Sequence, residues 1–116
     1  MFVVIFEVYL TEAGRSEYFS MAADLRKFLT DRPGFISIER FQSTSDRNKL
    51  LSISFWENEE AIAKWRNLFE HRMAQKKGRR EWFDRYRIRV ARVLRDYADS
   101  ERTQAPPDSN AELIAS

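Results

Sequence analysis

The sequence predicts one α+β domain whose strands and helices follow each other in the order β-α-β-β-α-β. The chain has 116 residues, which is the size of one domain and is enough for one hydrophobic core. Stretches in which apolar side chains alternate with a period of two, as in strands, give way twice to stretches with helical spacing. Gly, Pro or polar residues separate the stretches, which marks the turns between elements.

The first predicted element is a strand over residues 2–10, FVVIFEVYL. It is rich in β-branched and aromatic residues, which favour strands. The stretch has no basic region before it and no small-residue cleavage site, so it is not expected to be a signal peptide. Because this strand is apolar on both faces, it needs cover on both sides.

A helix is predicted after the turn residue Gly14. From Ser16 onward, apolar side chains recur at spacings of three and four, which places them on one face of a helix. Ser16, or Thr11 before it, can cap the N-terminus. The helix is expected to end near Asp31, because Arg32 precedes a proline and is disfavoured in the α region.

Two strands joined by a short polar connection follow, over residues 35–43 and 49–56. Their alternation and the length of the connection predict an antiparallel hairpin. Ser52 and Ser54 share a face with Trp56, and their small side chains leave room there. That room is either the floor of a cavity or part of a solvated face.

The second helix and the last strand complete the pattern. Asn58 is placed to cap the helix, whose apolar stripe runs to Met73, and Gly78 is expected just after its C-terminus. A long strand is predicted over residues 84–97. Its alternation is upset at Val93, where a bulge is expected.

The chain therefore divides into a domain at 1–97 and a polar tail at 98–116 that is expected to be flexible. The tail has two adjacent prolines and few apolar side chains. Leu113 and Ile114 are the residues through which it could dock on a partner subunit.

Composition excludes several kinds of site. The chain has no cysteine, which rules out disulfides, thiolate metal sites and cysteine nucleophiles and is compatible with the cytoplasm. A single histidine rules out a multi-histidine metal site within one chain, and no metal is expected. No apolar run reaches the roughly 20 residues that cross a bilayer, so no membrane partner is expected.

Positive charge is concentrated in residues 64–95, which hold twelve basic and three acidic side chains, although the net charge of the chain is only +2. This asymmetry indicates an anionic partner or a contact between the two halves of the molecule. Trp82, Phe83 and Tyr86 lie among these charges, as base-stacking residues do in RNA-binding sheets. The motifs that carry such aromatics in RNA-recognition domains are missing, so nucleic acid is not expected as a partner.

The order of elements is that of a ferredoxin-like fold, a four-stranded antiparallel sheet with both helices on one face. The other face would carry apolar residues of the first strand together with Ala91 and Val93 of the last. A second copy of the same sheet is the simplest cover, so we expect a two-fold symmetric homodimer through this face.

One set of residues follows the pattern of a known family. It comprises FISIERFQS, then LLSISFWENEEAIAKWRN, then His71, Ala74-Gln75, Gly78-Arg79, Trp82-Phe83, Tyr86, Arg89-Val90 and Arg95-Asp96-Tyr97. Over about its first 97 residues the chain thus resembles the antibiotic biosynthesis monooxygenase (ABM) family. The resemblance implies a dimeric α+β barrel of ferredoxin-like protomers, with a pocket between each sheet and its helices.

The resemblance also implies a function, which is a cofactor-independent monooxygenase that acts on a small aromatic or quinol-like compound. Such an enzyme needs neither a metal nor a bound cofactor, because an electron-rich substrate anion passes an electron to O₂. The protein supplies orientation, stabilisation of the anion and a dry site. The alternative is a non-catalytic dimer of the same fold that binds a small ligand or serves in stress, and haem binding or degradation comes third.

The candidate site residues come from the same stretch of resemblance. The candidates for catalysis are His71, Trp65 and Tyr86, and the candidates for substrate binding are Trp56, Arg79, Trp82, Arg89 and Arg40. In this hypothesis the tryptophans line the pocket, Tyr86 orients the substrate, His71 moves a proton and an arginine stabilises an oxyanion. Each has a plain structural alternative: a core tryptophan, a histidine at a helix end, or an arginine in a surface ion pair.

The haem-degrading branch of the family uses an Asn on the first strand, a Trp on the second helix and a His about ten residues after that Trp. Trp65 matches the Trp, but Gln75 stands at the position of the His. The first strand has no Asn, and His71 is displaced from the ligand position by about one helical turn. The sequence therefore places haem degradation behind the other two functions.

Overall fold

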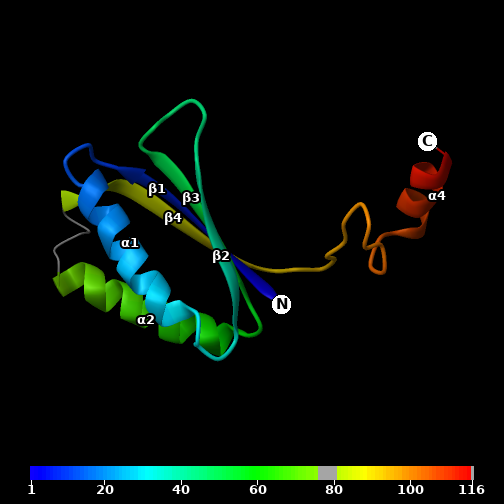
Figure 1. Cartoon of the computed structure of the whole chain (residues 1–116), viewed down its shortest axis with the longest axis horizontal. Helices are drawn as coiled ribbons and strands as arrows, with labels where there is room; N and C mark the ends of the chain where they lie inside the picture. The colour runs from blue at the N-terminus through cyan, green and yellow to red at the C-terminus, as the bar shows by residue number, and fades with distance from the viewer. Residues whose placement is uncertain (76–80, 116) are drawn as a thin grey trace.

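A computed structural model of the chain describes residues 1–75 and 81–115. Its elements are β1 (Phe2–Leu10), α1 (Arg15–Leu29), β2 (Phe35–Gln42), β3 (Lys49–Trp56), α2 (Glu59–Gln75), β4 (Phe83–Arg92) and α4 (Pro107–Ala115). The strands form one antiparallel sheet in the order β2-β3-β1-β4. Helices α1 and α2 lie on the same face of this sheet (Figure 1). The predicted ferredoxin-like α+β fold is confirmed, while Gly78 lies outside the described residues.

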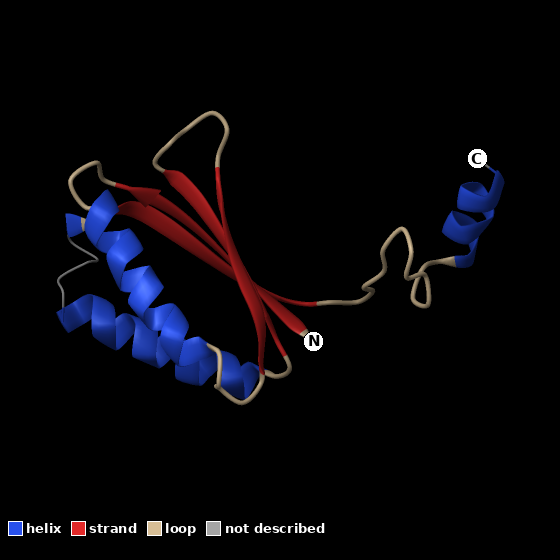
Figure 2. Cartoon of the chain, in the orientation of Figure 1, coloured by secondary structure: helices blue, strands red, loops and turns tan. Residues whose placement is uncertain are grey.

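Central strand β1 divides its side chains between the two faces of the sheet. Phe6, Val8 and Leu10 face the helices and are at most 9% exposed, in a core that also holds Tyr18 and Leu25 of α1. The alternate side chains of β1 point to the face without helices, which Figure 2 shows as the open side of the sheet. The alternation of the strand therefore separates a helix-covered core from an uncovered face.

Strand β4 ends at Arg92, earlier than predicted, and the bulge expected at Val93 is not formed. Arg92 pairs with Phe2, the first residue of β1, so β1 offers no further residues for pairing. The amide of Val93 makes the last contact, at 3.0 Å to the carbonyl of Met1. The register shift in this pair of strands lies at its other end.

The turn that follows α1 brings β2 next to the start of α2. Gly34 has a φ of 84°, a left-handed conformation that favours glycine, and its carbonyl accepts the amide of Glu57 at 2.8 Å. The side-chain oxygen of Asn58 accepts the amide of Ala61 at 2.8 Å. The predicted cap of the second helix is therefore confirmed.

Gly14 holds the start of α1 against the start of β4. It is the N-cap residue of α1 and has no side-chain cap, so neither Ser16 nor Thr11 caps the helix as predicted. The Thr11 hydroxyl instead accepts the Gly14 amide at 3.0 Å and donates to the carbonyl of Glu81 at 2.7 Å. A Cβ on Gly14 would lie 2.4 Å from the Cα of Trp82, so only glycine fits this close approach.

The segment after β4 extends away from the sheet and ends in helix α4, which the sequence did not predict (Figure 1). Arg102 organises this segment, with its Nε donating to Asn110 at 3.0 Å and an Nη donating to Ser109 at 2.8 Å. Its guanidinium also lies 5.0 Å from the centre of the Tyr97 ring.

Within the described residues, no helix is long and apolar enough to cross a membrane. The division into a domain and a flexible tail stays a prediction.

Replacing Gly14 by alanine should lower the free energy of unfolding by about 1–3 kcal/mol, the usual cost of forcing an extra carbon into a packed site. The physical reason is the approach of Trp82 to the Gly14 Cα. Urea unfolding followed by circular dichroism measures the change. Ser16→Ala, at an exposed position in the first turn of α1, should change stability by no more than about 0.5 kcal/mol. Equal midpoints for Gly14→Ala and the unmodified protein would contradict the packing argument.

Candidate functional site

A cavity of about 260 Å³ lies between the sheet and the two helices, and all four strands contribute to its lining. One wall is apolar and comes from β1, β4 and α2: Val4, Phe6, Ile62, Trp65, Phe69, Ile88 and Val90. Ile88 and Val90 are still 44% and 48% exposed, so the cavity reaches solvent on the β4 side. A concave, mainly apolar site of this kind is typical of small-molecule binding.

The opposite wall carries the polar side chains Tyr18, Arg40, Ser52 and Ser54, which come from α1, β2 and β3. Arg40 and Ser52 are paired across β2 and β3, so their side chains leave the same face of the sheet. Ser52 and Ser54 are buried, with 8% and 4% of their surface exposed. Of the two outcomes that the sequence left open for these serines, the structure shows the cavity floor.

Tyr18 is buried, with 1% of its surface exposed. Burial raises the pKa of its hydroxyl, and the neighbouring Arg40 partly offsets this through its charge and through hydrogen bonding. The hydroxyl therefore stays protonated at neutral pH and can act as a donor. The Nε of Arg40 is itself buried and has no hydrogen-bond partner among the described residues.

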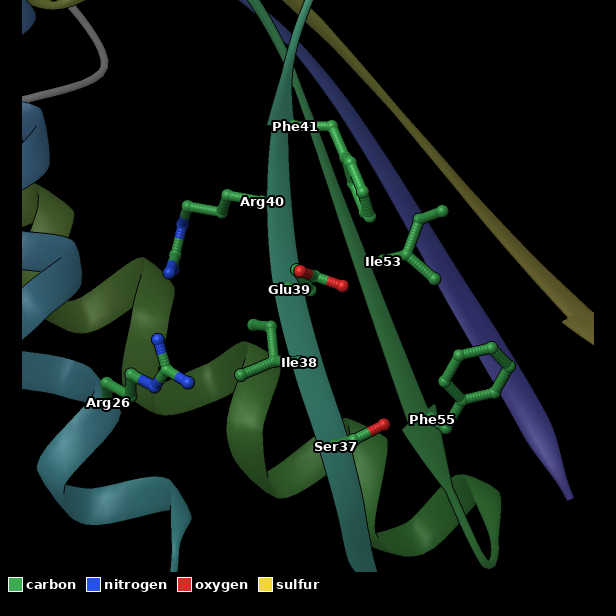
Figure 3. A pocket seen from close by; sticks show the side chains of 8 residues that line it. All are labelled: Arg26, Ser37, Ile38, Glu39, Arg40, Phe41, Ile53 and Phe55. Carbon is green, nitrogen blue, oxygen red and sulfur yellow. The ribbon is translucent and has the colours of Figure 1, made fainter.

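A second hollow, of about 650 Å³, follows the edge strand β2 and shares Arg40 and Ile38 with the cavity. Figure 3 shows the guanidinium groups of Arg40 and Arg26 on the helix side of β2, with Glu39 pointing to the other side. Arg66 of α2 also lines the cavity. Within the described part of the chain these three arginines form no salt bridge, and the cavity lining contains no carboxylate.

Of the residues singled out from the sequence, the structure brings Trp65 and Arg40 to the cavity wall. Trp56 lies behind this wall, fully buried, with its ring centre 6.5 Å from that of Trp65. Its indole N–H donates to the Ser54 hydroxyl at 2.8 Å. Trp56 thus supports the polar wall and is not part of the lining.

Tyr86 and Trp82 lie near the cavity but do not line it. Tyr86 is 42% exposed and its ring centre is 5.7 Å from that of Phe6, which does line the cavity. Trp82 is 4% exposed and packs against Gly14, where the start of α1 meets β4. The placement of Trp82 matches its structural alternative, a hydrophobic seal.

His71 and Arg89 lie away from the cavity in this chain. His71 is exposed on α2. Arg89 pairs with Ile5 and so points to the uncovered face, where its guanidinium contacts the carboxylate of Glu7 at 3.3 Å. Arg79 lies outside the described residues. Substrate binding by Arg79 and Arg89 and proton transfer by His71 stay predictions.

The sequence did not single out Tyr18, Phe69 or Arg66 as site residues. Helical spacing assigned Tyr18 to the buried stripe of α1, which is where it lies, but spacing does not show what a helix faces across a sheet. The charge of Arg40, on the helix side of β2, is the signal that could have identified Tyr18. A partly buried guanidinium needs a polar neighbour, and the helix above the strand is where such a neighbour would lie.

Metal and haem ligands are not gathered at this site. The described residues contain no cluster of three or more His, Cys, Asp or Glu side chains that could hold a metal ion. No histidine is found among the described lining residues of the cavity, since His71 is exposed, and Gln75 stands at the exposed end of α2. The described lining residues therefore offer no histidine as an axial ligand, so they do not fit a haem group in this cavity.

The buried hydroxyl of Tyr18 makes stability depend on alkaline pH. Its folded pKa is raised above the ordinary value of 10.0, so its contribution to stability is complete below pH 10.0 and is lost as pH rises through the folded pKa. Above pH 10.0, we expect the unmodified protein to lose stability relative to Tyr18→Phe. The free energy of unfolding should fall by up to about 1.4 kcal/mol per pH unit more than that of the variant. Urea unfolding of both proteins at several alkaline pH values measures it. A pH-independent difference would contradict the burial of an ionisable hydroxyl.

The fold and sequence match known proteins. The model of the antibiotic biosynthesis monooxygenase family matches residues 1–77. Jasmonate monooxygenase ABM of Pyricularia oryzae is 37% identical over 101 residues, which are 87% of this chain and 47% of that protein. The chain thus spans about half the length of this relative. YqjZ of Bacillus subtilis, an uncharacterized protein, is 32% identical over 102 residues, 88% of this chain and 87% of that protein.

Solved structures share the architecture. SnoaB, a cofactor-independent oxygenase from Streptomyces nogalater, superposes with a TM-score of 0.65 at 13% identity, covering 82% of this chain and 94% of its own. A mutant of MhuD with two manganese protoporphyrin IX molecules bound per active site has a TM-score of 0.63 at 18% identity, covering 84% and 99%. At such identities the similarity establishes the fold. Together with the match over residues 1–77, the sequence relatives show that the chain belongs to the antibiotic biosynthesis monooxygenase family.

Proposed function

We propose that this protein is an oxygenase that acts, without a metal or bound cofactor, on a small aromatic or quinol-like compound held in the cavity between the sheet and α1 and α2. The observation that carries the proposal is the cavity itself, whose apolar wall contains the aromatic rings of Phe6, Trp65 and Phe69. Membership in a monooxygenase family supports oxygen chemistry at such a site. Its volume of about 260 Å³ suits a small aromatic compound.

The geometry fits a reaction in which the protein positions the substrate and excludes water. For an anthrone-like compound, a ring CH₂ group and O₂ give a C=O group and water, so one oxygen atom is retained and the other is released. The substrate anion supplies the first electron to O₂. Trp65 and Phe69 would hold the ring, and Arg40 would stabilise the developing negative charge on the substrate oxygen.

The same proposal includes a homodimer formed through the uncovered face of the sheet. The β1 and β3 side chains on that face include Val3, Ile5, Leu51, Ile53 and Phe55, all apolar and only partly exposed. An apolar surface of this continuity favours burial against a second copy. The cytoplasmic location and the absence of nucleic-acid and membrane partners remain predictions from the sequence.

Oxygen uptake tests the proposed function. With a panel of anthrone-like and quinol compounds, we expect the protein to consume O₂ at a rate that a metal chelator does not change. Trp65→Ala should lower kcat/KM by about tenfold or more, because the loss of an aromatic wall removes contact with the substrate ring. Asn67→Ala, at an exposed position on the same helix, is the matched control and should leave the rate unchanged.

Two outcomes of this assay decide against the proposal. Saturable binding of the panel compounds without oxygen uptake would identify a non-catalytic binding protein. A Soret shift on addition of haem that is lost in His71→Ala would favour haem chemistry.

Proton transfer by His71 is tested in parallel, because His71→Ala lowers oxygen uptake only if this exposed side chain reaches the substrate in the assembled protein.

Sedimentation tests the dimer. We expect a particle of twice the 13.8 kDa chain mass at micromolar concentration. Ile53→Glu should shift the protein to the monomer, because it places a charge on the face that the proposed dimer would bury. Phe28→Glu makes the same change at a side chain of α1 that is 50% exposed, and this variant should stay dimeric. A monomer for the unmodified chain would rule out the dimeric barrel.

A further inference from the structure

The two walls of the cavity differ in chemistry, and the division follows the order of the strands. The wall over β1 and β4 is apolar, while the wall over β2 and β3 carries an arginine and two serines beside Ile38, with Tyr18 of α1 above it. A ligand that fits both walls has an apolar body at one end and a polar group at the other. The cavity therefore gives its ligand a direction across the sheet.

Arg40 indicates the charge of that polar group. It is half-buried on the helix side of β2, and its Nε has no hydrogen-bond partner among the described residues. None of the described carboxylates lines the cavity, and Glu39, the adjacent acidic residue, points to the other side of the strand (Figure 3). A buried guanidinium nitrogen without a hydrogen-bond partner is costly, so an anion from outside the chain would supply the missing interaction.

Arg26 and Arg66 add to the same positive region. Arg26 lies on the helix side of β2 with Arg40, and Arg66 lines the cavity from α2. Neither forms a salt bridge within the described part of the chain. Arg40 and Arg66 line the cavity and Arg26 lines the hollow beside it, so three positive charges lie in or next to the site and raise the local concentration of anions.

The neighbours of Arg40 are hydrogen-bond donors. The Tyr18 hydroxyl is buried in its protonated form beside the guanidinium. The Ser54 hydroxyl accepts the indole N–H of Trp56 at 2.8 Å, so its own proton remains available for donation. Each of these groups can donate to an oxygen atom placed at this wall.

We propose that the cavity binds its substrate as an anion, with a negatively charged oxygen held by Arg40 and Tyr18 at the β2–β3 wall and the ring system lying over β1, β4 and α2. This inference rests on the proposed function, since it assigns the charge and the orientation of the substrate at the same site. It adds Tyr18 as a substrate-binding residue. The anionic oxygen belongs to a carboxylate or to an ionised enol. Both groups present a negatively charged oxygen that a guanidinium and a tyrosine hydroxyl can bind.

Binding of four probes with one ring system tests the proposal. The anions are 1-naphthoate and 2-hydroxy-1,4-naphthoquinone, which is ionised at neutral pH. Their neutral counterparts are 1-naphthamide and 2-methoxy-1,4-naphthoquinone. Titration calorimetry under nitrogen measures affinity without turnover. We expect the unmodified protein to bind at least one anion about tenfold more tightly than its neutral counterpart. The anion that is preferred identifies the carboxylate or the enolate as the bound group.

Variants at the two walls should separate charge recognition from packing. Arg40→Gln should abolish the preference for the anion, and Tyr18→Phe should weaken anion binding about tenfold while neutral probes change by less than about twofold. Trp65→Phe should weaken anionic and neutral probes to the same extent. Arg47→Gln and Tyr97→Phe remove the same groups at exposed positions that do not line the cavity, and they should change the affinity for neither kind of probe.

Two results would overturn the proposal. One is equal affinity of the unmodified protein for anionic and neutral probes. The other is an Arg40→Gln variant, folded by its thermal transition, that loses both kinds of probe equally. If Tyr18→Phe fails to fold, Arg40→Gln alone decides the outcome. Anion preference without oxygen uptake would disprove the oxygenase function and leave this inference standing, so the two failures are distinguishable.

Discussion

The structure depends on β1, a central strand with apolar side chains on both faces. It pairs with β3 on one side and β4 on the other, so it fixes the register of three of the four strands. One face packs under α1 and α2 to form the core, and the cavity lies over the same face. The other face carries no helix, and in the proposed homodimer a second copy of the chain would cover it. In that assembly β1 would contribute to both the core of the subunit and the contact between subunits.

The cavity exists because the sheet changes its side chains from one half to the other. On β1 the helix-facing residues are large, and Phe6 and Val8 fill the space under α1. On β3 the residues paired with Phe6 and Val4 are Ser52 and Ser54, which are too small to reach the helices. The space they leave is bordered by Tyr18 and Arg40. Two small side chains thus leave the volume open, and two polar side chains border it.

Most of the fold could be predicted from the sequence, and only part of the site. The limits of β1 and β3 follow from their apolar patterns. The role of Asn58 as the cap of α2 follows from its place just before the apolar stripe of that helix. The end of β4 could not be predicted, because it depends on where the partner strand begins. Trp65 and Arg40 were found through family resemblance and charge. Tyr18 was missed because a side chain on a buried helical stripe shows its chemistry only when the facing strand is known.

The pairing of Trp56 with Trp65 gives the protein an internal optical reporter. Trp56 is fully buried and its indole N–H is bonded to Ser54, whereas Trp65 forms part of the cavity wall. Their ring centres are 6.5 Å apart with an interplanar angle of 31°, close enough for excitation energy to pass between the two indoles. We expect a compound that contacts Trp65 in the cavity to change the emission of this pair. Binding could then be followed in the unlabelled protein by its own fluorescence.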